Sequence, residues 1–484
     1  MKPSSPPRYP LRAPRLEHAL LLAGVLSLAA CANFSGITPH AQALTAEQLN
    51  LQGSARHEIP SQWWESFSDA QLNRLVTDAL TNSPSLRVAQ SRLERIQATQ
   101  DSLRGNERPQ LGASVDATRQ LFTAKGIYPP PLAGSVREIG TVQLNINWEL
   151  DFFGKNRAAL NAAMGQEQAA LADAQAARML LASSVTRTYF QLVRLEAQLG
   201  IAKRTLAQRE QNRNLVQDRV SAGLDTQLEL QQSAGALPEA RLQIEILQEQ
   251  KQLAHNALAA LISKPNMALA LDIPAQAAIQ PIALSTSMPM DLLARRPDIA
   301  AAKQRVRAAS AEVDGVKAQF YPNINLVAFV GLSSIGLDRL LDPGAEQWGV
   351  GPAIRLPLFD GGRLRANLRA RTADLDAAVE SYNTVVIDAV HDVADQVATT
   401  QLILRQQAEQ AQAQASAETA YAIATQRYQV GLGTYLHVLA AETAVLAQRR
   451  QAVDLHARLL DTQVQLMRAL GGGYKYTSEA LPPS

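Results

Sequence analysis

The chain has 484 residues, with 46 Lys and Arg against 44 Asp and Glu, so its formal net charge is only +2. A nearly neutral chain without blocks of like charge, and without aromatic residues interleaved with a basic stripe, gives no sign of nucleic-acid binding. Aromatic residues make up 5% of the chain, and the 46% of hydrophobic residues is rich in alanine and leucine. This composition favours long, closely packed helices over a large globular core.

The N-terminus has the pattern of an export signal. Basic residues precede the apolar run Ala19–Ala30, which is too short to cross a bilayer as a mature helix. The run ends at Leu-Ala-Ala-Cys, which resembles the lipobox of bacterial lipoproteins, and Cys31 is the only cysteine. We expect residues 1–30 to be removed as a lipoprotein signal peptide and Cys31 to carry a covalent lipid, with no other cofactor. Ala32 follows, which in such lipoproteins favours the outer membrane; the alternative is an ordinary secretory signal with an incidental thiol.

Helices and two strands are predicted after a polar linker over residues 31–62. A short helix is expected over 69–80 and a second from Pro84 to about Asn106. Strict alternation over 111–118 and 142–150 predicts two strands, each with one apolar and one polar face. The polar face includes Asp116, Asn145 and Glu149.

A very long helical hairpin is predicted next. A pattern free of proline runs from about Lys155 to Val220, with apolar residues at threes, fours and sevens, which is typical of a coiled coil. Gly223 interrupts this pattern, and Asp225 or Thr226 is suited to cap a return helix that continues to about Ile262.

The second half of the chain repeats the first. The segment from Arg219 reads RVSAGLDTQLEL, and the segment from Arg427 reads RYQVGLGTYLHV. FFGKNR ends at Arg157 and FDGGR ends at Arg363, again about 210 residues apart. The repeat predicts a second helix, strand pair and hairpin: a helix from Pro297, strands after Pro322 and over 348–358, a long helix over 362–429 and a last helix over 434–470. We therefore divide the mature chain, after the linker, into a first repeat over 63–270, a second repeat over 271–472 and a tail over 473–484.

The strands predict a membrane barrel. Each is about ten residues long, which crosses an outer membrane when the strand is tilted. An open edge in lipid would leave backbone groups unpaired, at several kcal/mol each, so the sheet has to close. Four strands are too few, since the smallest such barrels have about eight; two, three or four chains would give roughly 8, 12 or 16. The alternative is a soluble four-stranded sheet covered by helices of the same chain.

The order of elements behind a lipobox resembles the outer membrane factor family, the TolC-like exit ducts, and within it the NodT-like lipoprotein branch of multidrug efflux. The resemblance rests above all on three blocks: LLARRPDIAAAKQRVRAASAEVDGVKAQFYPNINL over 292–326, LPLFDGGR over 356–363 and RYQVGLGTYLHVL over 427–439. It implies a mainly α fold, in which a homotrimer forms a 12-stranded transmembrane β-barrel and a long coiled-coil α-helical barrel. It further implies a location in the outer membrane, a periplasmic adaptor and an inner-membrane pump of the RND type as partners, and passive exit of small molecules.

The resemblance also assigns roles to the two hairpin turns. Glycine at these turns fits a helix C-cap with a left-handed backbone. By similarity the tips meet the adaptor through Gly223, Leu224, Thr226, Gly431, Leu432 and Thr434. Arg427 and Tyr428 match positions that latch the closed tip; the alternative is a cation and a packing ring at a helix end.

A constriction is a further hypothesis. Members of the family narrow the tunnel with acidic side chains in the first turns of the last helix, and the matching positions here are His437 and Ala440. The first repeat has Glu229 and Gln232 at the equivalent positions. A ring of Glu229 and His437 from the copies would narrow the pore, and histidine is charged near pH 6 but mostly neutral above pH 7. The alternative is that these are solvated tip residues.

The sequence contains no catalytic constellation. The seven histidines show no metal-ligand spacing such as HExxH, and neither GxSxG nor a Walker-type loop occurs, so we predict a protein that is not an enzyme. The segment Arg295–Asp298 reads RRPD, which fits a helix start rather than a site. The alternative function is a lipid-anchored periplasmic coiled-coil scaffold or adaptor without a pore. The transported cargo stays open.

Overall fold

The computed structural model describes residues 34–45, 47–48, 59–264, 271–279, 281–282 and 296–474. Cys31 and the predicted signal peptide lie outside these ranges. The described residues form two compact units, and each unit draws on both sequence repeats. The first unit comprises the described parts of Met1–Gln42, Glu94–Gln168 and Lys303–Ser381. The second comprises the described parts of Ala43–Leu93, Ala169–Ala302 and Tyr382–Ser484.

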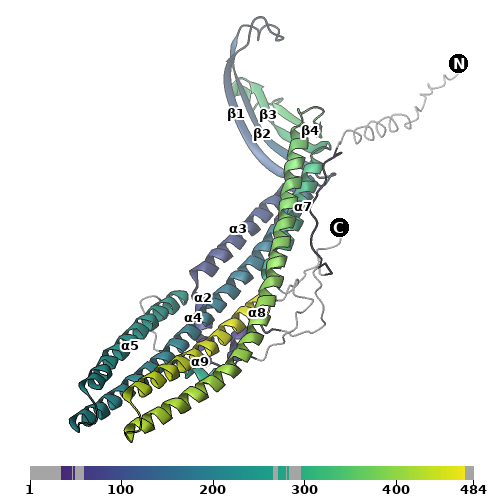
Figure 1. The fold of residues 1–484 in the computed structure, drawn as a ribbon. Helices are drawn as coiled ribbons and strands as arrows, with labels where there is room; N and C mark the ends of the chain where they lie inside the picture. The colour runs from purple at the N-terminus through teal and green to yellow at the C-terminus, as the bar shows by residue number, and fades with distance from the viewer. Residues whose placement is uncertain are drawn as a thin grey trace, which may run out of the picture. The chain divides into compact units, whose positions relative to one another are not determined.

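A four-stranded antiparallel sheet belongs to the first unit (Figure 1). Its strands are β1 (Gln110–Leu121), β2 (Val136–Leu150), β3 (Asn323–Ile335) and β4 (Glu346–Arg355). Each strand pairs with the next one along the chain, so the strand pairs of the two repeats join into one sheet. The order β1-β2-β3-β4 leaves β1 and β4 as the two edges.

The strand register gathers the apolar residues on one face. Ala113 lies opposite Leu144, Leu144 opposite Val330, and Val330 opposite Trp348, and directly opposed residues point to the same side. Trp348 is 77% exposed and Leu144 is 47% exposed, so helices of the same chain leave this face open. The two-faced strands are confirmed, and the alternative of a sheet covered by its own helices is wrong.

The opposite face of the sheet is mainly polar and hydrogen-bonded across the strands, although Val327 and Phe329 of β3 also lie on it. Gln347 Nε2 donates to Gln143 Oε1 at 3.2 Å, and Asn145 Nδ2 donates to Ser114 Oγ at 3.3 Å. Amide and hydroxyl groups of neighbouring strands therefore partner each other and still face solvent. The prediction that polar residues share one side of these strands is confirmed.

Three of the four strands are longer than the predicted ten residues. The strands contain 12, 15, 13 and 10 residues in chain order. The alternation over 348–358 places the end of β4 too far along the chain. The strand stops at Arg355, which lies opposite Asn323 at the start of β3. Pro322 precedes Asn323 and has no backbone N–H, so the ladder has no further donor there.

The helices follow the predicted order closely. Their bounds are α2 (Ala70–Asn82), α3 (Pro84–Asn106), α4 (Lys155–Ser221), α5 (Gln227–Leu261), α7 (Pro297–Ala318), α8 (Arg363–Gln429) and α9 (Tyr435–Ala469). Short 3-10 helices occur at η1 (Trp63–Phe67), η2 (Gln276–Ala278) and η3 (Leu337–Arg339). None of the helices in the described ranges combines the length and the apolar character that crossing a membrane would require.

The second unit has an aromatic core near its first helices. Trp63 and Phe67 of η1 are buried with Tyr189 of α4 and with side chains of α2, α5 and α9. Asp69 caps α2, since its Oδ1 accepts hydrogen bonds from the backbone N–H groups of Gln71 and Leu72 at 2.8 and 3.0 Å. Its Oδ2 accepts the hydroxyl of Tyr189 at 2.7 Å. The carboxylate that caps α2 thus also accepts the hydrogen bond of the buried Tyr189 hydroxyl. This bond links the start of α2 to α4.

Two glycines of the sheet allow a matched test of how closely the strands pack. A Cβ at Gly331 of β3 would lie 2.2 Å from the backbone oxygen of Val142, whereas a Cβ at Gly351 of β4 would meet nothing within 4 Å. We expect Gly331→Ala to push β3 away from β2 and to cost about 1–3 kcal/mol of folding stability, because backbone atoms cannot give way. Gly351→Ala should be nearly neutral. Thermal unfolding of both variants checks this, and equal midpoints would contradict it.

Candidate functional site

The two hairpin turns of the second unit have the same backbone geometry. After α4, the N–H of Leu224 donates to Arg219 O at 2.8 Å and the N–H of Gly223 donates to Val220 O at 3.0 Å. After α8, Leu432 and Gly431 make the equivalent bonds at 2.8 and 3.1 Å. This pattern is the Schellman motif, which needs a left-handed residue, and Gly223 and Gly431 have φ of 71° and 79°. The predicted glycine C-caps are confirmed.

A cluster of three side chains joins the first turn to α8. Arg219 Nε donates to Asp225 Oδ2 at 2.9 Å, and the hydroxyl of Tyr428 donates to the same oxygen. The guanidinium carbon of Arg219 lies 4.8 Å from the centre of the Tyr428 ring, a cation–π distance. We call Arg219, Asp225 and Tyr428 the tip cluster. It ties the first hairpin turn to the long helix of the second repeat.

The electrostatics of the tip cluster favour the bonded state. Burial alone would raise the pKa of Asp225, but the hydrogen bonds from Arg219 and Tyr428 outweigh it and hold the pKa below the usual value for an aspartate. Burial raises the pKa of the Tyr428 hydroxyl, and the bond to Asp225 raises it further. The phenol therefore stays protonated and the carboxylate ionised, so the donor and the acceptor persist at neutral pH.

Sequence reasoning identifies only part of this cluster. The resemblance predicts that Tyr428 latches the tip, but the sequence presents Asp225 only as a possible helix cap, and the cap of α5 is Thr226 instead. Arg219 stands out only as part of the repeat. The sequence contains one signal that could have identified Asp225. It stands where the second repeat has Gly433, so the two otherwise similar turns differ at this position.

The predicted constriction residues lie on exposed parts of the two return helices. Glu229 completes a capping box at the start of α5, where its Oε2 accepts the N–H of Thr226 at 3.0 Å. His437 Nδ1 lies 3.3 Å from Thr434 Oγ1 at the start of α9. Gln232 and Ala440 lie one turn further along, and both are exposed. Glu229 and His437 thus have local roles at helix starts, and a ring that narrows a pore stays a prediction.

Arg427 does not join the tip cluster. Its side chain is exposed, and Nη2 donates to the backbone oxygen of Leu432 at 3.3 Å. Arg427 therefore has a contact within its own turn, and its role in latching the closed tip stays a prediction. Leu224 and Leu432 are 65% and 70% exposed, so both turns present an apolar side chain to the outside.

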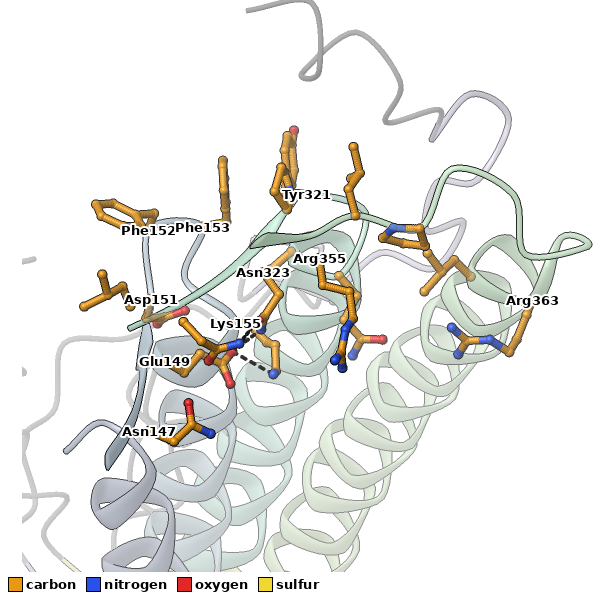
Figure 2. A pocket seen from close by; sticks show the side chains of 18 residues that line it. Asn147, Glu149, Asp151, Phe152, Phe153, Lys155, Tyr321, Asn323, Arg355 and Arg363 are labelled. Atoms are coloured by element: carbon orange, nitrogen blue, oxygen red, sulfur yellow. Dashed lines mark hydrogen bonds and ion pairs between the residues drawn. The ribbon is translucent and has the colours of Figure 1, made fainter. Parts of the chain in front are cut away.

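The first unit contains a polar pocket of about 650 Å³ where the strands meet the helices. Figure 2 shows that Glu149 at the end of β2 lies between Lys155 and Asn323. Lys155 Nζ is 2.8 Å from Glu149 Oε1, and Asn323 Nδ2 donates to the same oxygen at 2.7 Å. Arg355 of β4 also lines this pocket. The polar face predicted from the sequence thus continues into a charged wall beside the first turns of α4.

Aromatic side chains lie at the same strand ends. Phe153 stacks on Tyr321 with ring centres 4.9 Å apart, and Figure 2 shows both rings beside Phe152, away from the Glu149 group. Phe152 and Phe359 are strongly exposed. Phe34 packs against this region, with its ring centre 5.0 Å from that of Phe320. The N-terminal segment of the described chain is therefore held beside the ends of the strands.

Arg296 has a structural role, as the sequence predicted. It is buried at the start of α7 and binds Asp298 through two nitrogens, at 3.1 and 2.7 Å. Its Nη1 also donates to the backbone oxygen of Ala469 at the end of α9, at 3.2 Å. The arginine thereby satisfies a helix C-terminus within the second unit. Within the described ranges, no three or more His, Cys, Asp or Glu side chains gather as a metal site would need.

Comparisons with known proteins agree with a channel rather than a scaffold. The family model of the outer membrane efflux protein matches residues 75–264 and 288–472. The chain is 34% identical over 475 residues to the multidrug resistance outer membrane protein MdtQ of Escherichia coli O157:H7, covering 93% of this chain and 97% of that protein. It is 33% identical over 414 residues to the toluene efflux pump outer membrane protein TtgF of Pseudomonas putida, covering 85% of each.

A solved structure gives the same result. The chain superposes on the outer membrane protein VceC of Vibrio cholerae with a TM-score of 0.81 and 36% identity, covering 86% of this chain and 99% of that one. The matched family is one of transport proteins rather than enzymes. The matched residues include all four strands, the long helices of both repeats and the tip cluster. The chain therefore belongs to the outer membrane efflux protein family.

Proposed function

We propose that this chain is the outer-membrane exit duct of a three-part export system, through which small molecules leave the cell passively. Three copies would form one duct, with a 12-stranded barrel in the membrane and a helical tunnel below it. The observation that carries this proposal is the four-stranded sheet, which exposes an apolar face and ends in two unpaired edges. Such a sheet suits lipid on one side and water on the other.

The sheet edges require neighbouring copies. In lipid each unpaired backbone group costs several kcal/mol, so β1 and β4 need partners. Four strands fall short of the roughly eight in the smallest such barrels, whereas β4 of one copy pairing with β1 of the next closes a ring. Three copies give about 12 strands, the number implied by the resemblance to TolC-like ducts.

The partners follow from the same resemblance. The exposed hairpin turns, with Leu224 and Leu432 at their tips, suit docking by a periplasmic adaptor that connects the duct to an inner-membrane pump of the RND type. Relatives named for multidrug resistance and toluene efflux support drugs or other toxic small molecules as the cargo. The duct supplies a wall, and the pump supplies the energy and selects the cargo.

The tip cluster would hold the closed state. Opening requires the first hairpin turn and α8 to separate, which breaks the bond between Asp225 and Tyr428 and the contact of Arg219 with the Tyr428 ring. A hydrogen bond to an ionised group is worth about 1.5–3 kcal/mol. Glu229 and His437 would line the narrow end as a ring, with Gln232 and Ala440 one turn further in. An adaptor would open the duct by binding the separated tips more tightly than the joined ones.

A lipid on Cys31 would anchor each copy. Cys31 lies three residues before Phe34, and three extended residues span roughly 10 Å. Phe34 packs on Phe320 beside the exposed rings of Phe152 and Phe359, and exposed aromatic rings at strand ends are typical of a membrane interface. The acyl chains would therefore enter the bilayer beside the barrel wall.

Reconstitution of the purified chain into a planar bilayer tests the proposed function. We expect discrete conductance steps and a trimer mass in detergent. A scaffold or adaptor without a pore would leave the bilayer silent, and this result would overturn the proposal.

A matched pair of lysine variants tests the membrane face. Leu144 faces outward on β2 and the next residue, Asn145, lies on the polar face. Leu144→Lys should cost about 2–4 kcal/mol near the membrane midplane and strongly reduce the amount of assembled protein in the outer membrane. Asn145→Lys should assemble normally. Equal assembly of the two variants, measured in isolated outer membranes, would argue against lipid contact at this face.

Tyr428→Phe tests the latch, because it keeps the ring over Arg219 and removes only the hydroxyl. We expect the open probability to rise by roughly tenfold or more. Tyr435→Phe, in a ring 5.7 Å from that of Tyr428, is the control and should behave like the wild type. Single-channel recordings make the comparison, and identical open probabilities for all three proteins would exclude the latch.

The pH dependence separates the latch from the histidine ring. The pKa of Asp225 is lowered in the closed state, so its ionised carboxylate stabilises that state at pH values above the ordinary aspartate pKa near 3.9. This stabilisation is lost as the pH falls below that value. The latch should therefore be constant between pH 5 and 8 and weaken only below about pH 4. If the conductance of the wild-type channel changes between pH 5 and 8 and the change disappears in His437→Ala, the result would support the histidine ring. If His437→Ala has the same pH profile as the wild type, the ring is excluded.

Cys31→Ser tests the anchor. The wild-type protein should start at Cys31 and have a mass raised by the acyl chains, as measured by mass spectrometry of the intact protein. Cys31→Ser should lack this added mass and be less abundant in the outer membrane, while the assembled fraction still conducts. An unmodified Cys31 in the wild-type protein would show that the cysteine is incidental.

A further inference from the structure

The polar face of the sheet carries two groups of side chains that bind each other. The first group lies near the helices, where Lys155 and Asn323 both bind Glu149 (Figure 2). Asn325 Nδ2 donates to Asn323 Oδ1 in the same group. These polar side chains therefore find partners within the chain at this end of the sheet.

The second group crosses the sheet further along β3. Gln347 Nε2 donates to Gln143 Oε1 at 3.2 Å, and Gln143 Nε2 donates to Asn145 Oδ1 at 3.0 Å. Asn145 Nδ2 donates in turn to Ser114 Oγ at 3.3 Å. β3 runs between Gln347 and Gln143, and its residue opposite both of them is Gly331, whose missing side chain lets the two amides meet. We call Ser114, Gln143, Asn145 and Gln347 the amide chain.

A small apolar patch separates these two groups. Val327 and Phe329 of β3 lie on the same face, opposite Gly351 and Gly349 of β4. A Cβ at Gly349 would lie 2.7 Å from Cε1 and 3.0 Å from Cζ of Phe329, so the ring extends over this glycine. Val327 is 38% exposed and Phe329 is 36% exposed. We call these four residues the Phe329 patch.

The aromatic ring of the patch occurs in only one of the two repeats. RPQLGASV in the first repeat aligns with YPNINLVA in the second, and the residues that follow them are Asp116 and Phe329. The starts of β1 and β3, at Gln110 and Asn323, give the same offset of 213 positions. Each copy of the chain therefore has one aromatic ring at this position of its sheet, and the first repeat has a carboxylate instead.

The Phe329 ring offers exposed surface to a further molecule. Gly349 lies close to one side of the ring, and the exposed remainder is on the polar side of the sheet. An aromatic molecule that stacks there removes apolar surface from water, and two rings favour an offset or edge-to-face arrangement. The amides beside the patch already bind each other, so a bound ring replaces none of their hydrogen bonds. The patch therefore suits an aromatic group.

The position of the patch decides which molecules reach it. In the proposed trimer, lipid covers the apolar face and neighbouring copies pair through the edges β1 and β4, so neither of them meets Phe329. The polar face lines the water-filled interior, through which the cargo leaves. Three Phe329 rings, one from each copy, therefore face the path of the cargo.

We propose that Phe329 is a contact site for cargo that contains an aromatic ring. This inference rests on the proposed exit duct and names a class of cargo that its wall binds. A single exposed ring on a flat sheet gives weak binding, which lets the molecule leave again, as conduction requires. The wall thus adds a preference for aromatic molecules to the selection that the pump makes.

Ile335 provides a matched control on the same strand. It lies on the same face as Phe329, opposite Ile139, and is 43% exposed. The amide chain lies between Ile335 and the Phe329 patch, because Gln143 is opposite Gly331. Ile335 thus presents a comparable apolar side chain without an aromatic ring.

Binding of an aromatic probe to the trimer in lipid nanodiscs tests the proposal. The probe is para-fluorobenzyltrimethylammonium, whose permanent charge keeps it out of the lipid, and the broadening of its fluorine NMR signal reports its affinity. Phe329→Ser should weaken binding by roughly three- to tenfold, because the stacking contact is lost. Phe329→Trp restores an aromatic ring and should bind like the wild type. Ile335→Ser should also bind like the wild type.

Phe329→Leu gives the same test in a sheet that stays packed, because it keeps an apolar side chain beside Gly349 and removes only the ring. It should weaken binding by about threefold. Equal affinities for the wild type, Phe329→Ser and Phe329→Leu would overturn the proposal. Equal losses in Phe329→Ser and Ile335→Ser would also overturn it, because they would show adsorption to any apolar side chain.

Planar-bilayer recordings separate this proposal from the proposed function. The wild type and Phe329→Ser should both give conductance steps, since neither the strand edges nor the apolar face changes. Conducting channels that bind the probe equally with and without the ring would leave the exit duct intact and remove the aromatic site. A wild-type protein that gives no conductance would overturn the exit duct itself.

Discussion

The structure depends on the requirement that every backbone group of a membrane-facing sheet finds a partner. The four strands satisfy each other internally, but β1 and β4 each keep one unpaired edge, and the face around Leu144 and Trp348 is apolar and exposed. A bilayer accepts the apolar face but not the edges. The sheet of one chain is therefore incomplete by itself, and the proposed association with neighbouring copies follows from this deficit, whereas the number of three copies comes from the resemblance.

The long helices also leave some apolar side chains exposed in the single chain. Within one chain, α4 and α9 meet through buried apolar residues such as Ile201 and Val445 and through ion pairs such as Arg194 with Asp454, and these contacts form inside a single polypeptide without the entropy cost of association. On α5 and α8, the apolar side chains of Leu253 and Leu402 are 60% and 52% exposed. Burial of apolar surface is the dominant favourable term in most protein association, so apolar residues suit a contact between chains.

Divergence between the two repeats marks the positions with special roles. The two hairpin turns share a backbone geometry, yet only the first contains a carboxylate, at Asp225, where the second has Gly433. The buried acid Glu442 of α9 stands at a position where α5 has Ala234. Burial raises the pKa of Glu442, and the charge of Arg209 offsets part of that effect, so this pair needs both partners. In the proposed trimer, such differences would leave three-fold rather than six-fold equivalence.

The sequence alone determined the elements that depend on local pattern. The helix starts at Pro84 and Pro297, the glycine turns at Gly223 and Gly431, and the two-faced strands all follow from backbone preferences and alternation along a few residues. The order of elements and the resemblance to a family of exit ducts also came from the sequence. The tertiary structure decided which distant residues meet: Asp225 bonds Tyr428 across 203 positions, and Arg209 meets Glu442 across 233. Nothing in the local pattern encodes such pairs, because they arise only when two long helices adopt one relative register along their whole length.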